Sequence, residues 1–560
     1  MKKKFFIILA SAMVVATGCK KYLDINSDPD TTQDPSNASV MAPTLAAIPT
    51  ALQSDGGLYI AKYVQNWLTW NSANQNTYDA QGYAWSGGTM AANWTMTYLN
   101  HGENLNFMLE KARQLDEPHY IGVALAIKAW SFQYTTDYNG DIPFKEAFVK
   151  DLYIFKYDSQ QVVYKGVDSL CRLAIQYLDQ AIARGQNGTL SRGDIVYGGS
   201  LDKWKKFTYG ILARNWHHLT NKTGLYNADS VIKYCNNAMA SGADDFLVPF
   251  DANLNNNSNY FGTSRDNQRL WRQSNFIVGL LDGTVLTGSN TNGFNRDPRI
   301  AYMLAASPDT TNGNGGYRGV EPGVGDPYSG LTGTYAVGST NWINARRRVS
   351  TNWGDSLFVN PSINSFGNAN GKYLFKDKAV FPVMTYAEMQ FIKAEAAFRK
   401  GDKATAYTAY RAGIQAHFDF INRSYSDVRG STALYNTSPV PAATITRYFN
   451  SDNVKKTSGA LTLTDIMLQK YIALWGWGFM ETWVDMRRFH YLDLDPDTGE
   501  QVYKTFKMPV PLATNNEGRP VQRVRPHFTS EYTYNRDELI RIGATRSDYH
   551  VKEMWFSIPE

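Results

Sequence analysis

The amino-terminal stretch Met1–Cys19 constrains this chain most, because it decides in which compartment the remainder folds. Three lysines are followed by a short apolar run, Phe5 to Val15, and then by Ala16-Thr17-Gly18 directly before Cys19. This is the layout of a secretory signal, and its apolar part is too short to span a bilayer. A cysteine after the small residues predicts a lipoprotein, cleaved before Cys19 and acylated on its thiol. We therefore expect residues 1–18 to be a signal peptide and residues 19–38 a lipidated cysteine with a flexible tether. The alternative is an ordinary secretory signal with an incidental cysteine.

The composition of the remainder excludes several classes of function. No later stretch is long and apolar enough for a membrane-spanning helix. The net charge of +5 falls to +2 once the three leader lysines are removed, so nucleic acid is not an expected partner. Two further cysteines, Cys171 and Cys235, could pair in an oxidising compartment or remain buried thiols.

Apolar residues recur at helical spacing through much of the chain. Helices are predicted over 94–115, 120–136, 160–184, 201–220 and 463–489, with Asp202 as a possible cap of the fourth. Residues 386–400 and 403–421, joined at Gly401-Asp402, predict an antiparallel helix hairpin with small residues at its contact. The pattern predicts a mainly α protein with helices at about 90–240 and 380–490, in which the hairpin is tetratricopeptide-like in character, although no regular repeat period runs along the chain.

Between these helical parts lies a stretch of different composition. Residues 251–370 are rich in Asn, Gly, Ser and Thr, which predicts loops with short helices or strands. A second polar stretch, about 64–88, holds several aromatic residues among Asn, Gln and Ser. Aromatic faces stack on sugar rings while amide side chains satisfy hydroxyl groups. We therefore predict a ligand-binding region in these two stretches, within one domain spanning 39–560, although each single aromatic could instead belong to the core. The candidate ligand contacts are Trp67, Trp70, Tyr78, Tyr83, Trp85, Trp271, Tyr317, Trp342 and Trp353.

The acidic residues offer weaker candidates for catalysis. Glu481 and Asp485 share a helix face and could in principle serve a glycosidase. Nearby Arg487 and Arg488 lower carboxylate pKa values, which favours an ion-paired structural network instead. Asp137, in the Asp137–Ala147 segment, is interpreted as structural in the same way. The adjacent His217 and His218 point to different sides of a helix. We therefore expect no catalytic residue, no metal site and no cofactor.

Several segments together resemble one known family. The segment Asp137–Ala147 (DYNGDIPFKEA) follows an Ala-rich helix, and Tyr197-Gly198-Gly199 precedes Trp204 and Phe207. Asp297-Pro298-Arg299 comes next, and residues 382–413 and 469–488 supply late helical motifs in the same order. In this number and order, the motifs resemble the SusD/RagB family of surface nutrient-binding lipoproteins of Gram-negative bacteria. The resemblance implies a mostly helical, tetratricopeptide-like fold with irregular loops.

The resemblance also implies a function. It predicts a non-enzymatic, lipid-anchored protein of the outer membrane that faces the cell exterior and captures an oligosaccharide or polysaccharide. It further predicts delivery of that ligand to a partner SusC-like TonB-dependent transporter. Three alternatives remain: peptide capture by the same mechanism, a surface glycoside hydrolase, and a structural adhesin.

Overall fold

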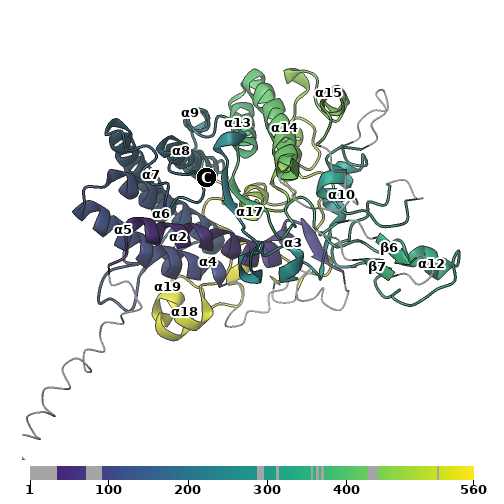
Figure 1. Cartoon of the computed structure of the whole chain (residues 1–560), viewed down its shortest axis with the longest axis horizontal. Helices are drawn as coiled ribbons and strands as arrows, with labels where there is room; N and C mark the ends of the chain where they lie inside the picture. Colours follow the sequence, from purple (N-terminus) through teal and green to yellow (C-terminus); the bar gives the residue numbers. More distant parts are fainter. Residues whose placement is uncertain are drawn as a thin grey trace, which may run out of the picture.

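The computed structural model places helix pairs on one side of the molecule and loops with very short strands on the other (Figure 1). It describes residues 34–70, 91–286, 296–310, 315–354, 357–360, 365–367, 371–426, 439–513 and 516–560. The prediction of a mainly α fold is confirmed. The α-helices are α2 Asn37–Ala51, α3 Ala61–Tyr63, α4 Ala92–Thr95, α5 Gly102–Gln114, α6 Pro118–Asn139, α7 Gln160–Ala183, α8 Leu201–His217, α9 Ala228–Asn237, α10 Asn275–Leu281, α11 Ile300–Met303, α12 Thr340–Ala345, α13 Tyr386–Lys400, α14 Lys403–Ser426, α15 Ala442–Phe449, α16 Leu463–Leu474, α17 Phe479–Arg488, α18 Phe528–Tyr534 and α19 Arg536–Arg541.

The remaining elements are short. Two π-helical segments, η1 Leu52–Ile60 and η3 Met96–His101, continue α2 and α4. The 3₁₀ turns are η4 Gly242–Asp244, η5 Asn255–Asn257, η6 Thr263–Arg265, η8 Ser458–Ala460 and η10 Tyr549–Val551. The strands are β1 Trp67–Thr69, β2 Ile142–Pro143, β3 Tyr157–Asp158, β4 Phe246–Pro249, β5 Trp271–Gln273, β6 Leu357–Asn360, β7 Ser365–Gly367 and β8 Val380–Met384.

Helices that follow one another in the chain pack as antiparallel neighbours. Helix α6 packs on α7, α7 on α8 and α8 on α9, while α13 packs on both α9 and α14. On α7, the buried residues recur every three or four positions, so one face is apolar and the other meets solvent. Helix α6 is buried along nearly its whole length, since every residue except Lys128 is buried. It therefore forms the centre of this half of the molecule.

One predicted continuous helix and one predicted helix cap are wrong, and both errors have local causes. The single helix expected over 463–489 is two helices, α16 and α17, because the chain turns at Gly476, which has a φ of 90°. Helix α8 is capped by Ser200, whose hydroxyl accepts a hydrogen bond from the amide of Lys203, while Asp202 lies in the first turn. The hairpin at Gly401 is confirmed, with α13 ending on that glycine at a φ of 88°.

The strands form four antiparallel pairs among the described residues: β1 with β5, β2 with β3, β4 with β8, and β6 with β7. The pair of β1 and β5 matters most for function, because it joins the two polar, aromatic stretches that the sequence singled out. Trp67 lies opposite Gln273, and Thr69 lies opposite Trp271.

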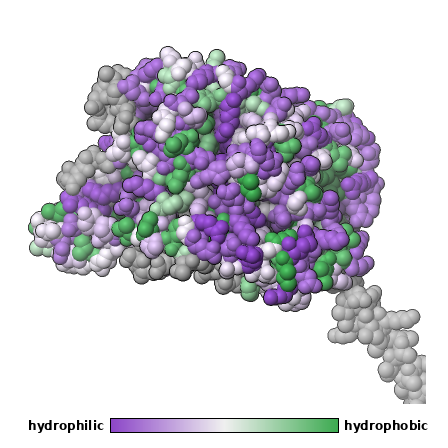
Figure 2. Space-filling view, turned by 180° about the vertical axis from the view of Figure 1, so that it is seen from behind, coloured by the Kyte–Doolittle hydropathy of each residue, from purple (hydrophilic) through white to green (hydrophobic). Residues whose placement is uncertain are grey.

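Both halves contribute to one large apolar core. A single cluster of buried side chains runs from Val40 in α2 to Phe556 near the end of the chain. Cys171 and Cys235 are buried and unpaired, which decides between the two possibilities left open by the sequence. No helix in the described part of the chain is long and apolar enough to cross a membrane. On the rear face, hydrophobic residues are scattered among hydrophilic ones (Figure 2).

Candidate binding site

Three of the predicted aromatic contacts are core residues. Trp67 is 0% exposed, its indole N–H donates to the Gly57 carbonyl, and its ring packs edge-on against four other rings, including Phe261 and Trp475. Trp271 is 4% and Trp353 is 7% exposed. The Trp353 indole donates to the Phe261 carbonyl at 2.9 Å. Trp67 presents no surface to a ligand, so its prediction as a contact is corrected to a structural role.

Three others lie at the surface of the loop region. Trp70, Tyr317 and Trp342 are partly exposed. The Arg346 guanidinium lies 4.4 Å from the centre of the Trp342 ring, and that of Arg296 lies 5.8 Å from the Tyr317 ring. These three aromatics can meet a ligand without rearrangement of the core. The predicted contacts Tyr78, Tyr83 and Trp85, and the lipidation site Cys19, lie outside the described residues.

A pocket of about 360 Å³ opens in this region. It lies between α10 with the turn that follows it, the segments around Tyr317 and Tyr328, and the segment around Arg347. The volume is in the range of small-ligand sites, and two tyrosines with several polar groups line it. Of the predicted contacts that the structure describes, only Tyr317 belongs to its wall. The other lining residues are Asn275, Val278, Gly279, Asp282, Thr284, Arg318, Gly319, Asp326, Pro327, Tyr328, Arg347 and Val349.

Asp326 holds the pocket to the strand pair. Its amide donates to the Trp70 carbonyl at 3.0 Å, and its carboxylate accepts from the amides of Tyr328 and Val349, each at 3.0 Å. The guanidinium of Arg272 on β5 donates to the Val349 carbonyl at 2.9 Å. The pocket wall is thus attached by a backbone hydrogen bond to the residue that follows β1 and by a side-chain hydrogen bond to β5. Both strands are anchored in the core.

The charges around the pocket balance one another. Arg347 donates to the Asp309 carboxylate at 2.6 Å, and Arg318 donates to the Asp309 carbonyl at 2.7 Å. Burial raises the pKa of Asp326 and lowers the pKa of Arg318. Arg318 and Arg347 both pair with Asp309, and the positive charges of Arg272 and Arg348 act on the carboxylate of Asp326. Such a pocket favours a neutral, hydroxylated ligand over a polyanion.

Sequence reasoning missed most of this pocket. Tyr328, Arg318 and Arg347 were not singled out, although Asp326-Pro327-Tyr328 is a turn signal with an aromatic residue inside the Gly-rich stretch. The signal that could have found them is the density of turn-forming residues around Tyr328, because aromatic residues on turns are held at a surface.

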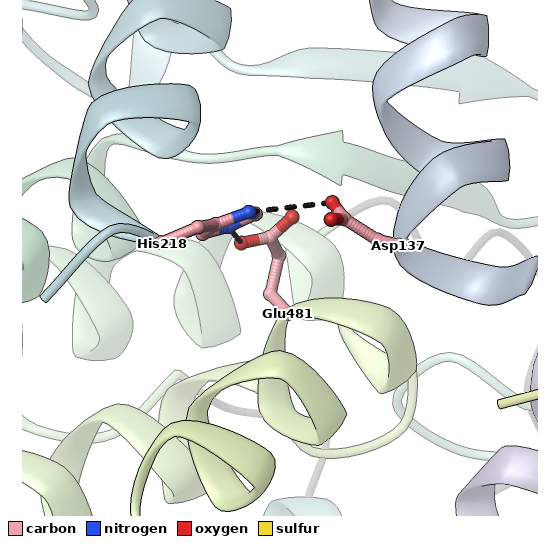
Figure 3. Close-up of side chains that lie close together, drawn as sticks. All are labelled: Asp137, His218 and Glu481. Carbon is pink, nitrogen blue, oxygen red and sulfur yellow. Dashed lines mark hydrogen bonds and ion pairs between the residues drawn. The ribbon is translucent and has the colours of Figure 1, made fainter. Parts of the chain in front are cut away.

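A second cluster of polar side chains is the buried triad of Asp137, His218 and Glu481 (Figure 3). Helices α6, α8 and α17 bring these three residues together. The His218 ring nitrogens lie 3.3 Å from Asp137 and 3.0 Å from Glu481, and all three side chains are buried. Burial alone would lower the pKa of His218, but the two carboxylates outweigh it and raise the pKa to about 9. His218 is therefore an imidazolium at neutral pH.

The triad has the residue types and spacing of a metal site, with ligand atoms within 4.8 Å of one another. Its electrostatics favour a structural role. The Arg214 guanidinium lies 3.4 Å from Glu481, and the Tyr164 hydroxyl donates to Asp137. The charged imidazole of His218 already supplies the positive charge that a metal ion would bring between the two carboxylates. The prediction that Asp137 is structural is supported by this arrangement.

A wider network of buried ion pairs surrounds the triad. Glu388 receives two hydrogen bonds from Arg214, at 2.6 and 2.7 Å. Arg488 bonds both Glu395, at 2.9 Å, and Asp485, at 2.6 Å. The expected pairing within the last helix is found for Asp485 with Arg488, whereas Glu481 pairs with Arg214 and His218 of other segments. Arg487 instead donates to the carbonyls of Asp137 and Gln522. Positive neighbours hold the pKa of Glu481 and Glu395 well below the usual range, despite their burial, so neither carboxyl is poised as a general acid.

Comparison with known proteins assigns the family. A family model described as "Starch-binding associating with outer membrane" and called SusD-like matches residues 29–511. The chain belongs to the SusD-like family. The resemblance seen in the sequence is thereby confirmed. A search of curated proteins finds no match.

Solved structures of other SusD homologues share the fold. A chitin-binding SusD homologue from Flavobacterium johnsoniae is 19% identical, with a TM-score of 0.64 over 94% of this chain and 99% of that one. A SusD homologue from Bacteroides fragilis is 18% identical, with a TM-score of 0.65 over 93% and 99%. A SusD/RagB family protein from Bacteroides thetaiotaomicron is 19% identical, with a TM-score of 0.64 over 94% and 100%. At these identities the likeness establishes the SusD-like fold.

Proposed function

We propose that this SusD-like protein binds a neutral oligosaccharide or polysaccharide in the pocket beside α10. The observation that carries the proposal is a pocket with two tyrosines and balanced charges, hydrogen-bonded to a strand pair that is fixed in the core. Tyrosine rings stack on the C–H faces of sugars, and Asn275 and Asp282 add groups that bond hydroxyls. The family description and the chitin-binding homologue support a glycan ligand.

The proposed site combines the pocket with those aromatic residues that the sequence predicts as ligand contacts and that are partly exposed in the structure. Tyr317 and Tyr328 form the pocket wall, while Trp70 and Trp342 extend the aromatic surface around it. Trp271 and Trp353 are proposed as supports beneath this surface. Tyr78, Tyr83 and Trp85 stay candidate contacts by sequence alone.

The geometry supports binding without catalysis. Each carboxylate of Glu481 and Asp485 is paired with a buried cation, and the family is described by starch binding. We propose that the protein is not an enzyme. Incubation with polysaccharide should release no soluble sugar, whereas release by the purified protein would favour the glycoside hydrolase alternative.

The binding proposal is tested by measuring retention of immobilised starch, chitin and a glycan array. The double variant Tyr317→Ala, Tyr328→Ala should lose most of the binding of the unmodified protein. Tyr153→Ala is a matched control, because Tyr153 is 82% exposed and lies away from the pocket residues. Equal binding by the double variant and the control would contradict this site. Retention of peptides with no glycan bound would favour peptide capture instead.

We further propose that Cys19 anchors the protein by lipid to the outer membrane, facing the cell exterior, and that the helical side contacts a SusC-like TonB-dependent transporter. The family description supports association with the outer membrane. Cys19→Ala should move the protein from the membrane fraction to the soluble fraction. Affinity purification of the lipidated protein should recover a large β-barrel transporter. Recovery of none would weaken the delivery role and favour the adhesin alternative.

A further inference from the structure

A second pocket, of about 340 Å³, lies far from the proposed glycan site. It is formed by α7, by the carboxyl-terminal end of α8 with the turn that follows, and by the last segment of the chain. In Figure 1, α7 and α8 lie on the opposite side of the molecule from α10, beside which the first pocket opens. The walls carry Trp216 and Trp555 together with Tyr164, and the polar groups include Asp168, Asn215 and Lys165.

The aromatic walls are held in place by their neighbours. The Trp216 indole N–H donates to the Asp168 carboxylate at 2.9 Å. The Trp555 ring meets the Tyr164 ring edge-on, with centroids 5.7 Å apart, and the buried Lys222 ammonium lies 5.2 Å from the Trp555 centroid. Both tryptophans are partly exposed. Two indoles are thus presented to solvent with little freedom to move, which is the arrangement that binding to a flat apolar face requires.

Asn215 is an incomplete hydrogen-bonding group in this wall. Its amide nitrogen donates to the Tyr164 carbonyl at 3.1 Å, but its carbonyl oxygen is buried and has no hydrogen-bond partner among the described residues. The Asn215 residue is 3% exposed. Buried polar atoms are nearly always hydrogen-bonded, so an unpartnered acceptor beside a pocket points to a donor that the protein itself does not supply.

The Asp168 carboxylate can accept a further hydrogen bond, and its charge is balanced by Arg172. It accepts two hydrogen bonds from Arg172, at 2.7 and 3.1 Å, and one from Trp216. A carboxylate accepts about four hydrogen bonds, so roughly one more donor can be accommodated. Because Arg172 neutralises its charge, Asp168 does not demand a cationic ligand. Lys165, exposed at the rim, adds a donor.

We propose that this second pocket binds a single pyranose ring, either as a free sugar or as the end unit of an oligosaccharide. The C–H face of the ring would stack on Trp216 or Trp555, and its hydroxyls would donate to Asn215 and Asp168. An aromatic hydrocarbon would leave the Asn215 acceptor unpartnered, and a cation would find the charge of Asp168 already neutralised by Arg172. The site is independent of the pocket beside α10, so either one can exist without the other.

The test uses the purified full chain labelled with 5-fluorotryptophan and observed by ¹⁹F NMR. The variants Trp216→Phe and Trp555→Phe assign the two resonances by their disappearance. Methyl glycosides of glucose, galactose, mannose and N-acetylglucosamine are then titrated. At least one sugar should shift the Trp216 or Trp555 resonance in a saturable way. Unmoved resonances with every sugar would overturn the proposal.

Variants localise the effect and keep the two pockets distinguishable. Asn215→Leu removes the unpartnered acceptor with a side chain of similar size, and it should weaken the sugar titration at least tenfold. Tyr317→Ala with Tyr328→Ala should leave this titration unchanged, while it abolishes glycan retention at the first pocket. If Asn215→Leu binds sugar as well as the unmodified protein, the proposed recognition is wrong. If that variant does not fold, Trp555→Ala followed at the Trp216 resonance, and Trp216→Ala followed at the Trp555 resonance, test the stacking instead. An unchanged titration in both variants would overturn the proposal.

Discussion

Replacement of His218 by glutamine should change how the stability of the protein depends on pH. His218 lies 3.0 Å from Glu481 and 3.3 Å from Asp137, and its pKa is raised from 6.5 to about 9. Each unit of difference between the folded and unfolded pKa corresponds to about 1.4 kcal/mol. Charged His218 therefore contributes about 3 kcal/mol, to within the precision of the pKa.

The sign follows from the direction of the shift. Because the folded pKa lies above the unfolded one, the contribution is fully present below pH 6.5 and is lost as the pH rises to about 9. Across this window the unfolding free energy should fall by up to about 1.4 kcal/mol per pH unit from this group alone. In the variant His218→Gln, this pH-dependent contribution to the unfolding free energy is absent. The variant should also be about 3–5 kcal/mol less stable at pH 6, since two buried carboxylates lose their shared cation.

Urea denaturation between pH 6 and pH 9.5 measures both effects. Other groups titrate in this range in both proteins, so the difference between the two curves is the quantity of interest. That difference should be largest at pH 6 and should shrink by about 3 kcal/mol towards pH 9.5. NMR should show one histidine with a pKa well above 8 that disappears in the variant. Parallel stability curves, or no such histidine resonance, would refute the assignment of a buried imidazolium.

Three further predictions concern stability and reactivity. Trp67→Ala should reduce the unfolding free energy by about 3–5 kcal/mol in denaturant titrations, because the ring is fully buried among other aromatics; a loss below 1 kcal/mol would contradict its core placement. Arg299→Met should lower the unfolding free energy by about 3–5 kcal/mol, because the buried Arg299 donates hydrogen bonds to Asp297 and Gln469. An unchanged melting temperature would argue against that pairing. Burial raises the pKa of Cys171 well above its usual range and that of Cys235 to about 12, so a disulfide reagent at pH 8 should label both only after unfolding; rapid labelling of the native protein would refute their burial.

The sequence could predict the helical half well because that half depends on local patterns. Apolar spacing located α7 and the hairpin around Gly401 to within a few residues. The break between α16 and α17 was missed, because Gly476 lies inside an otherwise continuous apolar pattern, and in the fold Tyr373 and Leu374 lie beside its turn. Local periodicity carries no information about such a contact.

The site was harder to predict because burial of an aromatic residue depends on distant segments. Trp67 and Trp70 are three residues apart in the same polar stretch, yet the first is enclosed by Phe261 and Trp475 and the second is partly exposed. Their environments are decided by residues about 200 and 400 positions away, which composition and spacing do not reveal. Tyr328 was missed for the same reason, since its partners are assembled only by the pairing of β1 with β5.

The buried ion pairs have a consequence for the way this chain must be made. His218 on α8 pairs with Glu481, 263 residues later, and Glu395 on α13 pairs with Arg488, 93 residues later. A chain that emerges from its amino terminus exposes α8 and α13 long before α17 exists. Burying their charges without partners is costly, so the two helices cannot complete their packing until the last pairs arrive. The packing of these two helices is thereby completed only after Glu481 and Arg488 have been made, close to the end of synthesis.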